Sequence, residues 1–147
     1  MRDAIVVGYD RTAASWEAVR WAAAEADARA RTLRVVTCDE RFDVSTAEET
    51  WGLAVAVTSA YAEVRSELDQ ACSQLRTRHP DLEVEAFLLG ASCTDALCDE
   101  RLSSELVVVG SSSHRGAAAM WRGSTPRIIA RHSHSPVVIV RGAPDPT

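Results

Sequence analysis

The chain has 147 residues, of which 46% are hydrophobic and 25% are charged, and its formal net charge is −5. A chain of this length forms one domain that buries about two-thirds of its unfolded surface, with the composition of an ordinary globular protein. The acidic balance argues against a surface that coats nucleic acid, so we expect no nucleic-acid partner.

The sequence also disfavours a membrane or secreted protein, a zinc or redox framework, and chemistry that depends on lysine. No apolar run approaches the ~20 residues of a membrane span, and a strand-like segment starts at Ala4, so we expect no membrane anchor or signal peptide. Four cysteines at irregular spacings, with no C-x-x-C pair, disfavour a zinc or redox framework and indicate reduced thiols in a cytoplasmic protein. All 16 basic residues are arginine, which excludes a Walker-type lysine and Schiff-base chemistry.

The first third of the chain predicts a strand, a helix and a second strand. Residues 4–8 form a continuous apolar run, typical of a strand buried on both faces of a parallel sheet. A helix follows, because Ala14, Ala18, Trp21, Ala22 and Ala26 share one face. Trp21 is thus predicted in the core, whereas Trp16 lies off the apolar stripe and is expected to be partly exposed. Residues 33–37 form the second predicted strand, and residues 41–50 a polar loop.

The middle of the chain predicts a long helix and a third strand. Apolar residues recur every three or four positions from Leu53 to Leu75, and His79-Pro80 ends the pattern. Residues 82–88 alternate as a strand with one more exposed face. Ser92 is the expected cap of a helix over residues 94–102.

The last third predicts a strand at 106–109, a helix around 126–132 and a strand at 136–141. We expect one domain over residues 1–142, followed by a tail at 143–147. The whole pattern predicts an α/β fold, a doubly wound five-stranded parallel sheet with four helices. In such folds, ligands bind at the carboxyl ends of the strands where the strand order reverses. The loops at 9–12 and 110–125 are therefore the candidate site.

The second of these loops has the residue types of a phosphate site. An apolar strand runs into Gly110 and three serines, and a second glycine-hydroxyl step, Gly123-Ser124-Thr125, opens a helix. Small side chains let backbone N–H groups approach an anion, and the dipole at a helix N-terminus favours negative charge. Ser124 is also an ordinary helix cap, and this alternative stays open.

These residues resemble the universal stress protein family over nearly the whole chain. The opening strand, Asp10 and the first helix match the start of that family. Its nucleotide motif is glycine, two residues, glycine, nine residues, glycine, then serine or threonine, and here Gly110, Gly123 and Ser124 fill three of the four positions. Ser113 stands at the second glycine. The resemblance implies a Rossmann-like fold of the adenine nucleotide alpha hydrolase-like type.

The resemblance also implies a ligand and a partner. ATP or AMP would lie between the two loops, with Mg²⁺ present only together with the nucleotide. Asp10 would lie near the ribose and the adenine edge, and the end of the second strand would contact the base. A homodimer through residues 136–141 is common in the family, and the protein partner remains open. The implied nucleotide-binding residues are Tyr9, Asp10, Arg11, Thr12, Val36, Thr37, Gly110, Ser113, Arg115, Gly116, Gly123, Ser124 and Thr125.

Ser113 decides whether the site is occupied. If its backbone must adopt a left-handed conformation, a Cβ costs about 1–2 kcal/mol, which weakens binding by about tenfold to thirtyfold. The Ser113 hydroxyl and a bidentate contact from Arg115 would offset part of this loss. Alternatively, the three serines form only a surface loop. Arg11 would either clamp a phosphate or crowd the pocket.

Three functions follow. The first is a regulatory module of the stress response that binds ATP or AMP. The second is a scaffold or dimer of the same fold without nucleotide. The third is a slow ATP-hydrolysing enzyme, which is disfavoured because no catalytic base or metal cluster accompanies the phosphate loop. We nominate no catalytic and no metal-binding residue.

Overall fold

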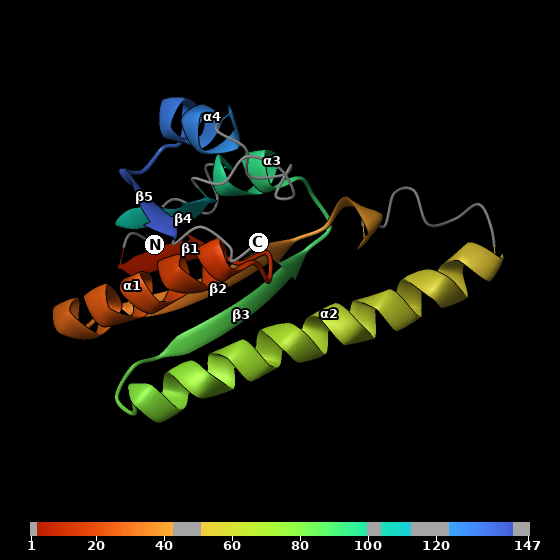
Figure 1. Cartoon of the computed structure of the whole chain (residues 1–147), viewed down its shortest axis with the longest axis horizontal. Helices are drawn as coiled ribbons and strands as arrows, with labels where there is room; N and C mark the ends of the chain where they lie inside the picture. Colours follow the sequence, from red (N-terminus) through yellow and green to blue (C-terminus); the bar gives the residue numbers. More distant parts are fainter. Residues whose placement is uncertain (1–2, 43–50, 100–103, 113–123, 143–147) are drawn as a thin grey trace.

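A computed structural model describes residues 3–42, 51–99, 104–112 and 124–142 (Figure 1). Strands and helices alternate through these segments. In chain order they are β1 (Ala4–Gly8), α1 (Ala13–Arg29), β2 (Thr32–Cys38), the short 3₁₀ helix η1 (Glu40–Phe42), α2 (Trp51–Arg78), β3 (Val84–Leu89), α3 (Cys93–Leu97), β4 (Leu106–Ser112), α4 (Ser124–His132) and β5 (Val137–Gly142).

The five strands form one parallel sheet in the order β3-β2-β1-β4-β5. The chain first builds outward from β1 through β2 to β3, then returns to the other side of β1 with β4 and β5. The reversal therefore falls between β1 and β4, where Val7 is in register with Val108. This confirms the predicted α/β, doubly wound parallel sheet.

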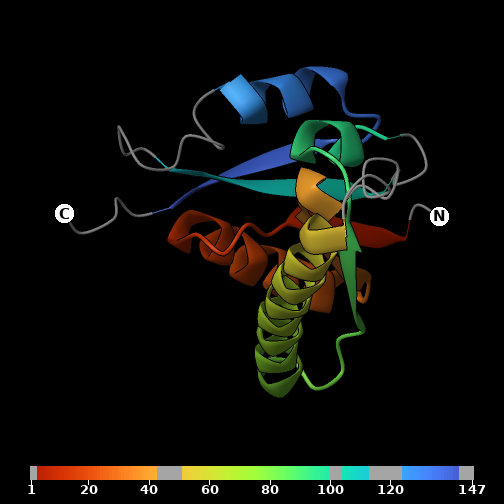
Figure 2. The same ribbon diagram turned by 90° about the vertical axis from the view of Figure 1, so that its right-hand side faces the viewer.

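The helices cover the sheet from both sides, with α1 and α2 on one face and α3 and α4 on the other (Figure 2). Alternation along β1 supplies both cores, because Ile5 and Val7 pack toward α1 and α2 whereas Val6 packs toward α3 and α4. All three side chains are fully buried. The continuous apolar run at 4–8 is thus explained by burial on two faces.

Helix α1 packs closely on the sheet because its buried face is made mostly of alanine. Ala18, Ala22 and Ala26 are completely inaccessible to solvent. The predicted core position of Trp21 is wrong: this residue is 36% exposed, because the buried stripe is centred on the alanines and Trp21 lies at its margin. Trp16 is half-buried, as expected, and its ring meets that of Tyr9 edge-on at 6.1 Å.

Several element boundaries differ from the sequence prediction. The helix expected over 94–102 is wrong at its C-terminal end: α3 stops at Leu97, and Cys98 caps it by donating its N–H to the Thr94 and Ala96 carbonyls. The predicted loop at 41–50 begins inside η1, where Phe42 packs edge-on against Tyr61 at 5.3 Å, and residues 43–50 lie outside the described residues.

Strand β4 continues past its predicted end to Ser112, because Ser111 and Ser112 pair with Arg141 and Gly142 of β5. In the described part of the chain, no helix combines the length and the apolar character needed to cross a membrane.

Candidate nucleotide site at the carboxyl edge of the sheet

The two predicted loops leave the sheet from neighbouring strands. β1 and β4 are parallel and hydrogen-bonded, so their carboxyl ends open at the same edge and at the point where the strand order reverses. This is the position at which open α/β sheets bind ligands.

The end of β2 is tied to the loop after β1 by two hydrogen bonds. The Tyr9 N–H donates to the Val36 carbonyl at 2.9 Å, and the buried Thr37 hydroxyl donates to the Tyr9 carbonyl at 2.9 Å. Val36 is fully buried. Three predicted site residues are thus brought together, and the half-buried Cys38 follows them at the end of β2.

Asp10 and Thr12 form a turn that starts α1. One Asp10 carboxylate oxygen, Oδ1, accepts hydrogen bonds from the Thr12 N–H at 3.0 Å and from the Thr12 hydroxyl. The Thr12 hydroxyl oxygen in turn accepts the Ser15 N–H at 3.2 Å and caps the helix. Within the described residues, the second Asp10 oxygen, Oδ2, has no hydrogen-bond partner. It is the atom of this turn that is left for a ligand hydroxyl.

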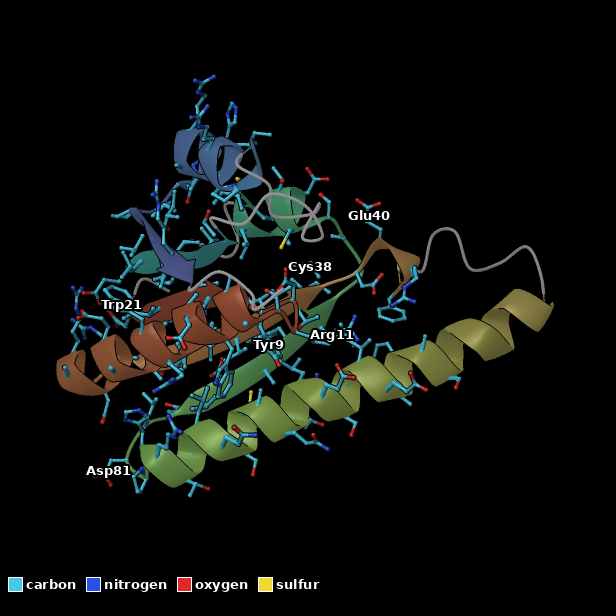
Figure 3. All side chains as sticks on the ribbon, viewed as in Figure 1. Tyr9, Arg11, Trp21, Cys38, Glu40 and Asp81 are labelled. Carbon is cyan, nitrogen blue, oxygen red and sulfur yellow. The ribbon has the colours of Figure 1, made fainter. Side chains whose placement is uncertain are left out.

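Arg11 pairs with a residue of α2. Its φ of 70° is left-handed, and its guanidinium forms an exposed ion pair with Glu67 of α2 at 3.2 Å. Figure 3 shows Arg11 and Tyr9 beside α2. Together with Trp16 they line a shallow groove of about 360 Å³, and burial, with a smaller contribution from the Glu67 charge, raises the pKa of Tyr9.

Asp39 and Arg41 follow β2 at the same edge. The Arg41 guanidinium contacts both Asp39 carboxylate oxygens, with Nη2 2.6 Å from Oδ2 and Nε 3.0 Å from Oδ1. This hydrogen bonding holds the pKa of Asp39 below its usual value.

Gly110, the first glycine of the phosphate loop, lies directly against the first turn of α1. A Cβ built on Gly110 would lie 2.6 Å from the Ala14 carbonyl oxygen and 3.0 Å from the Ser15 Cα atom. Gly142 on β5 meets the same alanine, with Ala14 Cα at 2.6 Å from the added Cβ. The close approach of α1 therefore requires glycine at position 110 whether or not a phosphate binds there.

The rest of the predicted phosphate loop is only partly described. Ser113, Arg115, Gly116 and Gly123 lie outside the described residues. The backbone of Ser124 and Thr125 opens helix α4, as the glycine-hydroxyl step predicts. Among the described residues, no group of three or more His, Cys, Asp or Glu side chains is arranged to hold a metal ion.

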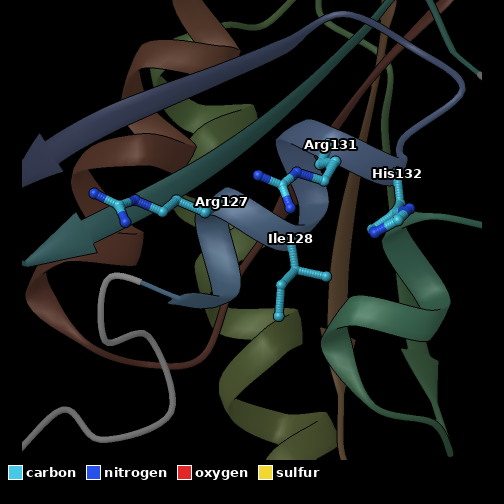
Figure 4. Close-up of a pocket in the computed structure, with 4 residues that line it drawn as sticks. All are labelled: Arg127, Ile128, Arg131 and His132. Atoms are coloured by element: carbon cyan, nitrogen blue, oxygen red, sulfur yellow. The ribbon is translucent and has the colours of Figure 1, made fainter.

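A surface that the sequence did not indicate lies on α4. Arg127, Ile128, Arg131 and His132 line an open hollow of about 340 Å³ (Figure 4). Ile128 is 42% exposed there, and the two arginines make no ion pair within the described residues. The four lining residues all belong to α4, and the hollow is on the exposed face of this helix.

The topology defines a doubly wound α/β protein, and the ends of β1 and β4 form its candidate ligand site at the carboxyl edge. The universal stress protein family model matches residues 1–141, and the chain belongs to this family. A comparison with curated proteins found no match.

Solved structures of the family share the fold. A universal stress protein in complex with cAMP is 22% identical, with a TM-score of 0.65, and the match covers 97% of this chain and 98% of that one. The Archaeoglobus fulgidus universal stress protein in complex with dAMP is 21% identical, with a TM-score of 0.67 and coverages of 92% and 95%. A family member from Burkholderia pseudomallei is 20% identical, with a TM-score of 0.69 and coverages of 94% and 95%.

Proposed function

We propose that this chain is a cytoplasmic regulatory protein that binds ATP or AMP at the carboxyl edge of β1, β2 and β4. The carrying observation is the Asp10 turn. It lies at the strand-order reversal, beside the end of β4, and keeps one carboxylate oxygen without a hydrogen-bond partner among the described residues. That two structural relatives were solved with cAMP and dAMP supports an adenine nucleotide as the ligand.

Each part of the nucleotide has a partner in this proposal. Asp10 Oδ2 accepts a ribose hydroxyl, while Oδ1 stays bound to Thr12. The base lies over the end of β2, around Val36 and Thr37. The phosphates lie along the loop that starts at Gly110, where the backbone of Ser113, Gly116, Gly123, Ser124 and Thr125 and the side chain of Arg115 surround them, with Mg²⁺ bound only as the nucleotide complex.

Calorimetric titration with Mg-ATP tests the role of Asp10. Asp10→Asn keeps an amide oxygen that can accept from Thr12 but replaces the Oδ2 acceptor with a donor. Losing a hydrogen bond to a charged group costs about 1.5–3 kcal/mol, which weakens ATP binding by about tenfold to a hundredfold. Asp81→Asn is the matched control, because Asp81 is exposed and lies at the far end of α2 (Figure 3). No heat from the wild-type protein up to millimolar ATP would refute the proposal.

Ser113→Gly tests the second-glycine position. If a serine backbone is strained in the bound loop, glycine tightens ATP binding by about tenfold or more. Tight wild-type binding that Ser113→Gly leaves unchanged would show that position 113 is not strained. Analysis of an acid extract of the purified protein for ATP and AMP identifies the nucleotide that is carried from the cell, and a phosphate-release assay tests for slow hydrolysis.

A second candidate function, a dimeric scaffold, is favoured by β5. This strand is at the edge of the sheet, and its Ile139 is 42% exposed. An unpaired strand edge with an exposed apolar side chain is a ready site for pairing with a second copy. We expect light scattering to give a dimer for the wild-type protein and a monomer for Ile139→Asp. A wild-type monomer at all concentrations would exclude this function.

A further inference from the structure

Two of the four cysteines meet at the carboxyl edge although 54 residues separate them in sequence. Cys38 is the last residue of β2 and is in register with Leu89 of β3. Only three residues separate Leu89 from Cys93, which begins α3, and α3 contacts β2. The fold therefore brings the two residues to one place.

The two side chains share one environment on the same face of the sheet. Both pack against the core between the sheet and α3 and α4, and each thiol shifts the pKa of the other. Both residues are half-buried, so a small solute can reach them, whereas Cys72 is fully buried. Cys98 is also half-buried, but within the described residues it has no thiol partner.

We propose that Cys38 and Cys93 form a redox centre that a small hydroperoxide oxidises to an intramolecular disulfide. The free cysteines of the described structure correspond to its reduced state. This inference does not depend on nucleotide binding.

The different acidities of the two thiols assign an order to the reaction. The neighbouring Cys93 thiol lowers the pKa of Cys38, whereas Cys38 and burial raise the pKa of Cys93. The thiolate is the nucleophile in cysteine oxidation. Cys38 therefore reacts first, and Cys93 resolves the product.

Both steps balance. In the first, with hydrogen peroxide as the oxidant, the Cys38 thiol gives its proton to solvent and the thiolate attacks one peroxide oxygen. An S–O bond forms, the O–O bond breaks, and Cys38 becomes a sulfenic acid while the leaving hydroxide takes up a proton from solvent and is released as water. In the second, the Cys93 sulfur attacks the Cys38 sulfur, an S–S bond forms and the S–O bond breaks. The Cys93 proton joins the leaving hydroxide to give a second water. Two thiols are oxidised and one hydroperoxide is reduced.

Formation of the bond requires only a local movement. The sulfur atoms must approach to about 2.05 Å. Cys93 starts a helix of five residues directly after the bend at 90–91, so the movement displaces a short helix end and leaves the sheet in place.

Peptide mapping of the full-length protein tests the proposal. Reduced protein is treated with hydrogen peroxide, its remaining thiols are alkylated under denaturing conditions, and it is digested with a protease that cleaves before aspartate. Each cysteine then lies on its own peptide: 27–38, 69–80, 81–94 and 95–98. We expect peptide 27–38 linked to peptide 81–94, and reduction with dithiothreitol restores the separate peptides. Full alkylation of both cysteines, or a link between any other pair, would overturn the proposal.

Variants test the order of the reaction. Cys98→Ser removes a half-buried thiol on the same short helix segment and is expected to keep the linked peptide. In Cys93→Ser, dimedone should label Cys38 as the trapped sulfenic acid, and faster than it labels Cys93 in Cys38→Ser. The opposite preference would refute the assigned order. The peptide map of the wild-type protein tests formation of the disulfide even if one of these variants does not fold.

Discussion

Replacement of Gly110 by alanine isolates the packing role of the first motif glycine. The backbone of Gly110 is outside the left-handed φ range, so alanine can adopt its conformation. Gly→Ala at such a position ordinarily stabilises a protein by about 0.4–1 kcal/mol, because it restricts the unfolded chain. Here the added methyl would lie 2.6 Å from the Ala14 carbonyl oxygen and 2.8 Å from the Ala14 carbonyl carbon.

The contacting atoms belong to a helix backbone, so no side-chain rotation relieves the overlap. The first turn of α1 must move away from β4, and overpacking of this kind costs about 1–3 kcal/mol. Less the stabilisation from the restricted unfolded chain, the net loss is about 1.3 kcal/mol in the free energy of unfolding, which lowers the Tm by about 3–5 °C for a chain of this size. We expect this loss for Gly110→Ala without any nucleotide present.

Urea denaturation followed by far-ultraviolet circular dichroism measures this loss, and an unchanged m-value confirms that only stability has changed. Ser111→Ala is the control, because the next residue of β4 faces the opposite side of the sheet, and we expect a change under about 0.5 kcal/mol. A Gly110→Ala variant that is as stable as the wild type or more stable would refute the packing argument.

Three further predictions concern the same edge of the sheet. Thr12→Ala removes the acceptor for the Ser15 N–H and should lower the free energy of unfolding by about 1 kcal/mol in urea titrations, whereas Thr12→Ser should retain it. Because Arg41 lowers the pKa of folded Asp39, this pair stabilises the protein above the unfolded pKa of about 4, and the stabilisation is lost as pH falls through the folded value. The Tm difference between wild type and Asp39→Asn should therefore be present at pH 7 and vanish in acid, and a constant difference would contradict this. ATP at about 100 times its Kd should stabilise the wild-type protein by about 2.7 kcal/mol in thermal melts. The same ATP concentration should stabilise Asp10→Asn by a smaller amount.

The sequence predicted the strands well because each buried strand has a strong local pattern. The continuous run at β1 reports burial on two faces, and it began and ended where expected. The alternation of apolar residues at the even positions 82–88 with Glu83, Glu85 and Phe87 predicts a strand whose two faces differ, although the strand itself starts at Val84. Trp21 was wrongly predicted in the core. Helical periodicity identifies the apolar face of α1, but it does not show which side chains at the margin of that face are buried against the sheet.

The candidate site was predicted only in outline. The loops after β1 and β4 follow from the α/β order alone, and the structure confirms that these strands are neighbours. Sequence patterns could not show that Arg11 pairs with Glu67, because the two residues lie 56 positions apart and meet only when α2 packs beside the sheet. The hollow on α4 was missed because its residues read as an ordinary solvated helix face.

The sequence by itself determined the alternation of strands and helices and the parallel sheet, since local hydrophobic periodicity and connection rules are sufficient for these. Only the tertiary structure decided that Gly110 lies against the backbone of Ala14 and that Cys38 meets Cys93. Both contacts join residues that are distant in the chain, and such contacts depend on how closely helices approach the sheet. That distance is set by packing and leaves no local pattern in the sequence.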